Sequence, residues 1–283
     1  MAPLILQYMP RKFNRLIEPF AGMAAITIAV SKQQRANQYS LNDLNAPLMG
    51  ILREAIETPD VLVAEYSKVW NEQLVFEGGS VAHFYKVRDE FNAGDKSAAN
   101  MLYLLARCVK GSVRYSSTGM FNQSPDKRRK GTSPTTLAKN VYQISSYLKT
   151  TFSSLDYREI LKQAVPGDLV YMDPPYQGVC SSHDNRYYAG IEFDDFVGAV
   201  DELNSRGIDF MISYDGQCGE KQYGIDLPEN LGLRKVLLNA GLSSQSVLLG
   251  RKEVTYEALY LSDKLQKMTH PVCQQKLLFE EVV

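Results

Sequence analysis

The sequence lacks the features that mark secreted, membrane-bound or zinc-binding proteins. No apolar run reaches the roughly 18 residues that a membrane-spanning helix needs. The opening stretch MAPLILQYMPRK has no small-residue cleavage pattern of a signal peptide. Four cysteines without a CxxC pair, together with only three histidines, do not favour a zinc cluster. We therefore expect a protein of the reducing cytoplasm with free thiols, no membrane association and no metal site.

The chain also lacks an excess of either charge. Lys and Arg number 31 against 32 Asp and Glu, so the formal net charge is −1. Because no overall basicity indicates a nucleic-acid-binding protein, any such site must be local. The 283 residues, 45% of them apolar, exclude wholesale disorder and suffice for one large core or a core with a small second domain.

Strand and helix patterns alternate near both ends of the chain but not in its middle. Residues 15–30 are typical of a strand, a tight turn and a helix, and the next predicted strand ends at Asp43. Residues 58–147 show helical patterns, the last over 135–151, and one hairpin signal. Alternation then resumes, which predicts an α/β fold with a doubly wound sheet and an inserted, mostly helical module. The predicted division is 1–57 and 151–283 for the sheet domain and 58–150 for the insertion.

The clearest chemical signal is Asp-Pro-Pro-Tyr at residues 173–176, directly after the apolar strand LVYM. Chance would give this tetrapeptide only about twice in a thousand chains of this length. Asp173 and the carbonyl of Pro174 offer two acceptors to one NH2 group, and Tyr176 offers a flat face for stacking. The arrangement suits the exocyclic amino group of a nucleobase and a sulfonium methyl donor, with catalysis by orientation and electrostatics. The alternative is a plain strand-to-loop turn.

A second signal is the small-residue turn Glu-Pro-Phe-Ala-Gly-Met-Ala-Ala at residues 18–25. Small residues let the backbone approach a ligand at the first strand-to-helix turn, although such turns also occur for packing alone. Asp43 at the end of the following strand strengthens the ligand-binding interpretation, because a carboxylate there can bind ribose hydroxyls.

Basic residues gather in the insertion. From Arg107 to Lys139 there are eight basic residues and one acid, Asp126, which leaves the rest of the chain with a charge of −8. Aromatic residues are interleaved with them, as in nucleic-acid-binding segments. A solvated loop is the alternative for the KRRK run. The basic residues are Arg107, Lys110, Arg114, Lys127, Arg128, Arg129, Lys130 and Lys139.

With these motifs in this order, the chain resembles the Dam-type (D12 class, α-group) DNA adenine-N6 methyltransferases from about Leu16 to Leu261. The resemblance implies S-adenosylmethionine as cofactor and Asp173, Pro174, Pro175 and Tyr176 as the catalytic loop. The late family motif resembles Arg251, Lys252, Val254, Glu257, Leu259 and Ser262. The implied cofactor-binding residues are Pro19, Phe20, Ala21, Gly22, Asp43, Asp156, Tyr157 and Asp173.

The resemblance also makes residues 58–150 a target-recognition domain with a DNA-binding hairpin at about 111–131. Basic side chains would hold phosphates, and polar tips would read base edges. The target adenine must be flipped out of the duplex, and an aromatic or amide side chain of the hairpin is expected to fill the gap, with Tyr115 as a candidate. The predicted DNA contacts are Arg114, Tyr115, Ser116, Ser117, Phe121, Asn122, Gln123, Lys127, Arg128, Arg129, Lys130 and Arg251.

Two positions depart from the family pattern. Ala24 stands where the cofactor loop usually has another glycine. The opening residues also lack the Gly/Lys-rich segment, with its aromatic and lysine, that touches the cofactor in the family. We expect either a start that is truncated or misassigned, or a cofactor site that is built differently.

The implied activity is site-specific methylation of duplex DNA, either by a solitary enzyme or by one with a cognate restriction endonuclease that need not contact it. The expected location is the cytoplasm of a prokaryote or phage host, at the nucleoid. Cytosine-N4 methylation remains an alternative, because the same acceptors suit that amino group, although a leading Asp favours adenine in the family. RNA adenine methylation and a catalytically silent DNA-binding relative are further alternatives.

Overall fold

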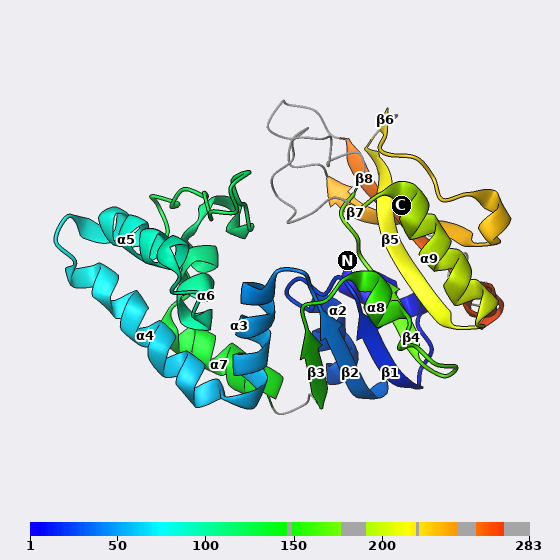
Figure 1. Cartoon of the computed structure of the whole chain (residues 1–283), viewed down its shortest axis with the longest axis horizontal. Coiled ribbons are helices and arrows are strands. Elements are labelled where there is room, and N and C mark those ends of the chain that lie inside the picture. The colour runs from blue at the N-terminus through cyan, green and yellow to red at the C-terminus, as the bar shows by residue number, and fades with distance from the viewer. Residues whose placement is uncertain (146–148, 177–190, 219–220, 243–252, 269–283) are drawn as a thin grey trace, which may run out of the picture.

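The computed structural model describes residues 1–145, 149–176, 191–218, 221–242 and 253–268 (Figure 1). Within these ranges, each helix is too short or too polar to cross a bilayer. The helices are α1 (Ala2–Ile5), α2 (Ala25–Lys32), α3 (Ala46–Glu57), α4 (Pro59–Val75), α5 (Gly79–Ala93), α6 (Ala98–Arg107), α7 (Pro134–Ser145), α8 (Tyr157–Leu161), α9 (Phe193–Ser205) and α11 (Asp263–Met268). The strands are β1 (Phe13–Glu18), β2 (Ala36–Asn42), β3 (Thr150–Ser153), β4 (Leu169–Met172), β5 (Asp209–Cys218), β6 (Lys221–Gln222), β7 (Arg234–Leu242) and β8 (Val254–Leu261). Short 3-10 turns η1 (Leu6–Tyr8), η2 (Val109–Gly111) and η3 (Glu229–Leu231) connect some of them.

The strands form one sheet in the order β3-β2-β1-β4-β5-β8-β7, with β6 paired to β5. β1 to β5 run parallel, whereas β8 lies antiparallel between β5 and β7. The chain winds outward from β1 in one direction through β2 and β3, and then in the other through β4 and β5. The carboxyl ends of β1 and β4 therefore flank the point of reversal, where ligands bind in such sheets. The predicted α/β sheet is confirmed.

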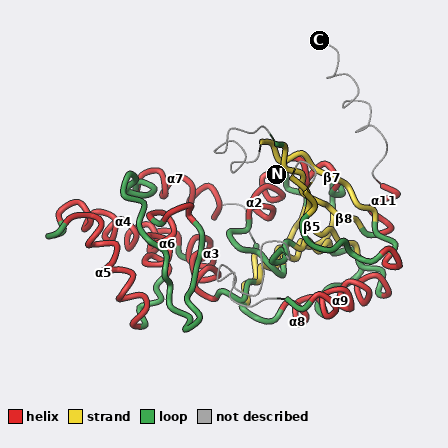
Figure 2. Tube along the Cα trace, turned by 90° about the horizontal axis from the view of Figure 1, so that it is seen from above, coloured by secondary structure: helices red, strands yellow, loops and turns green. Residues whose placement is uncertain are grey.

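The central strands of the sheet are buried on both faces, which explains why β4 is entirely apolar, whereas the edge strand β7 is mostly exposed. In β4, Leu169 and Tyr171 face the cluster that contains α2, while Val170 and Met172 face the cluster that contains α8 and α9. This is the two-residue period of a strand with helices on each side. Figure 2 shows α2 on one side of the strands and α8 and α9 on the other.

The helices α3 to α7 form a second core beside the sheet (Figure 1). α3 packs against α4, α6 and α7. The apolar core that these helices form also includes Ala21 and Ala24 of the turn after β1. The prediction of one helix over 135–151 was wrong at its end, because Thr150 and Thr151 belong to a strand. The following Thr150–Ser153 pairs with β2 as the edge strand β3, where β-branched residues are favoured.

The hairpin predicted within residues 111–131 is present in a minimal form. Tyr115 and Phe121 form an antiparallel bridge, and Cys108 pairs with Pro125 in the same way. The turn closes through a hydrogen bond from the Gly119 N–H to the Ser116 carbonyl at 2.9 Å. The loop is therefore held by isolated bridges rather than by two continuous strands.

Asn42, the last residue of β2, ties three segments together from a buried position. Its Nδ2 donates to the carbonyls of Pro19 (3.0 Å) and Leu155 (2.9 Å). Its Oδ1 accepts from the Leu155 N–H (2.9 Å) and the Ser153 hydroxyl (2.8 Å). One amide side chain thus satisfies backbone groups after β1 and after β3.

Asn42→Leu keeps a similar volume but leaves those backbone groups unpaired. Because each buried unpaired group costs about 1–3 kcal/mol, we expect a loss of about 3–5 kcal/mol in the free energy of unfolding. Urea denaturation measures this change. The control is Asn37→Leu, an exposed position on the same strand, for which the expected change is within about 0.5 kcal/mol. Equal losses in both variants would contradict the bridging role.

Candidate active site

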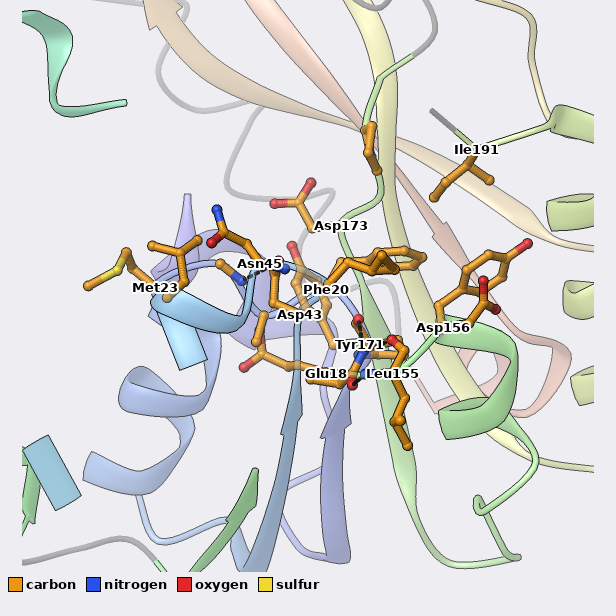
Figure 3. A pocket seen from close by; sticks show the side chains of 18 of the residues that line it. Glu18, Phe20, Met23, Asp43, Asn45, Leu155, Asp156, Tyr171, Asp173 and Ile191 are labelled. Carbon is orange, nitrogen blue, oxygen red and sulfur yellow. Dashed lines mark hydrogen bonds between the residues drawn. The ribbon is translucent and has the colours of Figure 1, made fainter. Parts of the chain in front are cut away.

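A cavity of about 720 Å³ lies at the carboxyl edge of the sheet. Its walls come from the ends of β1, β2 and β4, the loop before α8, the start of α9 and the base of the hairpin. Figure 3 shows the labelled side chains gathered above these strand ends. Segments that are far apart in the sequence meet here because parallel strands bring their carboxyl ends to one edge.

The turn after β1 contains two residues in the left-handed conformation, of which Gly22 lines the cavity and Ala24 is buried. Gly22 has φ +50° and an open space where a Cβ would stand. Ala24 has φ +53° at the residue that precedes α2. A glycine at this position, as the family pattern has it, would adopt this conformation without the cost that an L-residue bears. The departure at Ala24 therefore falls on a strained residue.

Asp43 fastens this turn to the end of β2. Its Oδ2 accepts the Gly22 N–H at 2.9 Å, and its Oδ1 accepts the Asn45 N–H at 2.9 Å. Burial raises the pKa of Asp43 above its usual range, and these two hydrogen bonds oppose the shift. The carboxylate lines the cavity with further lone pairs able to accept hydroxyl hydrogens.

Glu18 is an acidic group to which the sequence assigned no role, although it begins the small-residue turn. It is buried at the end of β1, and its Oε1 accepts the Thr27 N–H at 2.7 Å. Burial raises its pKa to about 7, and the nearby charge of Asp173 adds to the shift. A carboxyl group with this pKa is partly charged at neutral pH, so a cation in the cavity would favour its ionised form.

Asp173 follows β4 and opens to solvent through the cavity, although protein atoms surround most of its carboxyl group. This desolvation raises its pKa to about 6, Glu257 adds to the shift, and a hydrogen bond with Tyr176 opposes it. Pro175 also lines the cavity, whereas Pro174 is buried. The Tyr176 ring is half-buried and contacts Tyr214 edge-on at 6.3 Å between ring centres.

Aromatic side chains form another wall. The ring centres of Phe20 and Tyr157 lie 5.2 Å apart, and Phe196 packs behind both. Asp156 caps α8 by accepting the Arg158 N–H at 2.9 Å, and Arg158 bridges it to Asp195. A flat, apolar surface beside a carboxylate suits a purine ring with its amino group.

The cavity has a strongly acidic lining. Among the described residues that line it, six have carboxyl groups and only Arg158 is basic. Such a lining favours a ligand with positive charge, because the charge offsets the desolvation that raises the pKa values of Glu18, Asp43 and Asp173. The acids are Glu18, Asp43, Asp156, Asp173, Glu192 and Asp195.

Most of the predicted DNA-contacting residues of the hairpin and basic loop are accessible. Ser116 and Gln123 are half-buried, and Arg251 lies outside the described residues. Arg129 forms an ion pair with Asp126 at 2.7 Å. The exposed residues are Arg114, Ser117, Asn122, Lys127, Arg128, Arg129 and Lys130.

Three residues from this region are core residues instead. Tyr115 is 5% exposed and Phe121 is 1% exposed, and the two rings pack together at 6.1 Å. The prediction that Tyr115 fills a gap in the duplex was therefore wrong for this conformation, and so was surface contact through Phe121. Arg107 is also buried, and it donates to the carbonyls of Asp126 and Ser80, so it does not belong to the basic surface.

The sheet order and the cavity at its reversal point define a Rossmann-like fold with a ligand site. The sequence profile of the D12 class N6 adenine-specific DNA methyltransferases matches residues 1–239, and the chain belongs to this family. It is an enzyme that methylates adenine in DNA.

Three relatives illustrate the similarity. The Type II methyltransferase M1.LlaDCHI of Lactococcus lactis subsp. cremoris is 28% identical over 229 residues, 75% of this chain and 76% of the relative. The Type II methyltransferase M.MjaIII of Methanocaldococcus jannaschii is 26% identical over 267 residues, 88% of each chain. The DNA N-6-adenine-methyltransferase of Escherichia phage P1 is 25% identical over 225 residues, 75% of this chain and 28% of the relative.

The raised pKa of Glu18 makes stability depend on pH. Between its ordinary value of 4.5 and about 7, the folded chain keeps a proton that the unfolded chain has released, so stability falls as pH rises through this window. Glu18→Gln removes this dependence and keeps an oxygen for the Thr27 N–H. We compare the free energy of unfolding of the variant with that of wild type at two pH values. We expect this difference to shift in favour of the variant by on the order of 2–3 kcal/mol from about pH 5 to about pH 8.

Urea denaturation at both pH values measures the gain. The matched control is Glu57→Gln, an exposed glutamate at the end of α3, which should show no such pH-dependent difference. A constant difference between Glu18→Gln and wild type at both pH values would show that burial does not shift the Glu18 pKa.

Proposed function

We propose that this chain transfers a methyl group from S-adenosylmethionine to N6 of an adenine that is flipped out of duplex DNA, with Asp173 at the reacting amino group. The observation that carries the proposal is the Asp-Pro-Pro-Tyr loop, whose carboxylate opens into an acidic cavity at the reversal point of the sheet. S-adenosylmethionine supplies an electrophilic methyl group on a positively charged sulfur.

The cavity fits that cofactor by charge and by shape. The pKa values of Glu18, Asp43 and Asp173 are raised, and Arg158 is the one basic side chain among the described lining residues, which suits a ligand with a sulfonium and an ammonium group. We assign the ribose hydroxyls to Asp43 and the adenine ring to the wall of Phe20 and Tyr157, with Asp156 at the ring's edge. Backbone groups of the turn from Pro19 to Gly22 would complete the site.

At the other end of the cavity, Asp173 and the carbonyl of Pro174 would accept the two N–H hydrogens of the target amino group. This grip orients the nitrogen lone pair away from the ring, towards the methyl donor. The same carboxylate can take up the proton that the amino group releases once it is alkylated, because its pKa of about 6 lies near neutrality. Tyr176 is on the same loop. Its ring would stack on the flipped base after it rotates away from its present contact with Tyr214.

Two observations weigh against the alternatives. Family membership favours adenine over cytosine-N4 and over RNA as the target. An intact acidic cavity with its loop and carboxylates argues for an active enzyme rather than a silent DNA-binding relative.

We assign recognition of the target sequence to residues 58–150. We assign contact with the DNA phosphate backbone to the exposed basic loop at residues 127–130. We further propose that the enzyme acts in the prokaryotic cytoplasm, where the DNA lies. A cognate restriction endonuclease remains a prediction, supported by two relatives named as Type II methyltransferases.

Asp173→Ala removes one of the two acceptors without touching the turn after β1. We expect kcat to fall by at least about a hundredfold, while the affinity for S-adenosylmethionine stays within about threefold. Sequencing of DNA from an expressing host with modified-base detection identifies the target base and site, and isothermal titration measures cofactor binding. Asp201→Ala, at an exposed acid on α9, is the control and should methylate normally. Normal methylation by Asp173→Ala would overturn the catalytic assignment.

The exposed basic loop gives a separate prediction. Alanine at Lys127, Arg128 or Lys130 should weaken binding to all duplexes alike and reduce the slope of log affinity against log salt by about one for each phosphate that the variant no longer binds. Fluorescence anisotropy across a salt series measures the slope. Lys267→Ala, an exposed lysine on α11, should leave it unchanged. An unchanged slope in all three loop variants would remove this loop from the DNA interface.

A further inference from the structure

A line of hydrogen bonds runs from the cavity to the hairpin. The Gly22 N–H donates to Oδ2 of Asp43, and the Asn45 N–H donates to its Oδ1, both at 2.9 Å. The Tyr115 hydroxyl then donates to Oδ1 of Asn45 at 3.2 Å. Four residues thus join the turn after β1, the end of β2, the start of α3 and the hairpin.

The last link of this line is buried. Asn45 and Tyr115 are each 5% exposed, so their hydrogen bond is shielded from water and costly to leave unmade. Around it, the Tyr115 ring packs edge-on against Phe121, and Phe121 packs edge-on against Phe91. The Tyr115–Phe121 pair therefore anchors the hairpin, and the tyrosine hydroxyl bonds to the residue that precedes α3.

The hairpin also supplies part of the cavity wall. Ser112 and Val113, at its base, line the cavity together with Gly22, Asp43 and Asn45. A ligand that fills the cavity can therefore contact three residues of the hydrogen-bonded line and also the base of the hairpin. The hairpin tip points away from this core, and Met120 on it is 43% exposed.

We propose that Tyr115 and Asn45 are positioning residues that couple cofactor binding to DNA binding. A cofactor that touches the turn, Asp43 and the hairpin base stabilises the hairpin arrangement in which Tyr115 is bonded to Asn45. That arrangement presents the hairpin tip to DNA, so each ligand raises the affinity for the other. The inference rests on the proposed function, since it takes the cavity as the cofactor site and the hairpin as a DNA contact.

The test measures the coupling directly. A fluorescent duplex with the unmethylated target site, as identified by modified-base sequencing, is titrated with the enzyme with and without saturating S-adenosylhomocysteine. We expect the wild-type enzyme to bind the duplex at least about fivefold more tightly with the cofactor product present. The affinity for S-adenosylhomocysteine must rise by the same factor when the duplex is added.

Tyr115→Phe keeps the packed ring and removes only the hydroxyl. We expect its coupling to fall below about twofold, while the affinity for each ligand alone stays within about threefold of wild type. Asn45→Ala should lose the same coupling. The double variant should lose no more than either single variant, because each of the three removes the same Tyr115–Asn45 hydrogen bond. Tyr142→Phe is the matched control and should keep the wild-type coupling. It removes a hydroxyl on α7 that is bonded to Asp60 on α4.

Each other outcome has a defined meaning. A wild-type coupling near one, or an unchanged coupling in folded Tyr115→Phe, overturns the inference while leaving the proposed function in place. Additive losses in the double variant overturn the shared interaction between Tyr115 and Asn45. Failure of the wild-type enzyme to bind S-adenosylhomocysteine at all overturns the proposed function, and this inference with it.

Discussion

The structure depends on the crowding of carboxyl groups at one edge of a parallel sheet. β1, β2 and β4 end side by side, and the acids that follow or end them, Glu18, Asp43 and Asp173, share one cavity. Burial disfavours the charge on each, which raises all three pKa values. A folded chain that keeps such a cluster loses stability at neutral pH. A cationic ligand would stabilise the ionised acids, so the cost of burying them and the selectivity proposed for a sulfonium cofactor have the same physical origin.

The backbone around these acids is held by side chains that accept or donate several hydrogen bonds at once. Asn42 binds backbone groups on both sides of β2, and Asp43 clamps the turn after β1 to the start of α3. Because strands pair only along their lengths, the loops beyond their ends need such bridges to keep a fixed shape. The same bridges extend through Asn45 to the hairpin, which makes the cavity and the hairpin parts of one connected region.

A second polar network orders the basic loop from inside the helical core. The Gln73 amide donates to the Lys130 carbonyl and accepts from the Tyr103 hydroxyl, which also contacts Nδ1 of the buried His83. The Tyr66 hydroxyl donates to the Thr132 carbonyl at 2.6 Å. Backbone carbonyls are thus bound from within, so the side chains from Lys127 to Lys130 are left exposed to solvent.

The sequence alone was sufficient for the strand LVYM, the glycine turn and the Asp-Pro-Pro-Tyr loop, because apolar runs and turn residues act over a few neighbours. It was also sufficient to bring Asp43 and Asp173 to one sheet edge. Only the tertiary structure decided the edge strand β3, since its pairing with β2 joins residues over a hundred positions apart. It likewise decided the burial of Tyr115, Phe121 and Arg107 and the raised pKa of Glu18. A motif records which groups are near in sequence, whereas burial and charge depend on what distant segments pack against them.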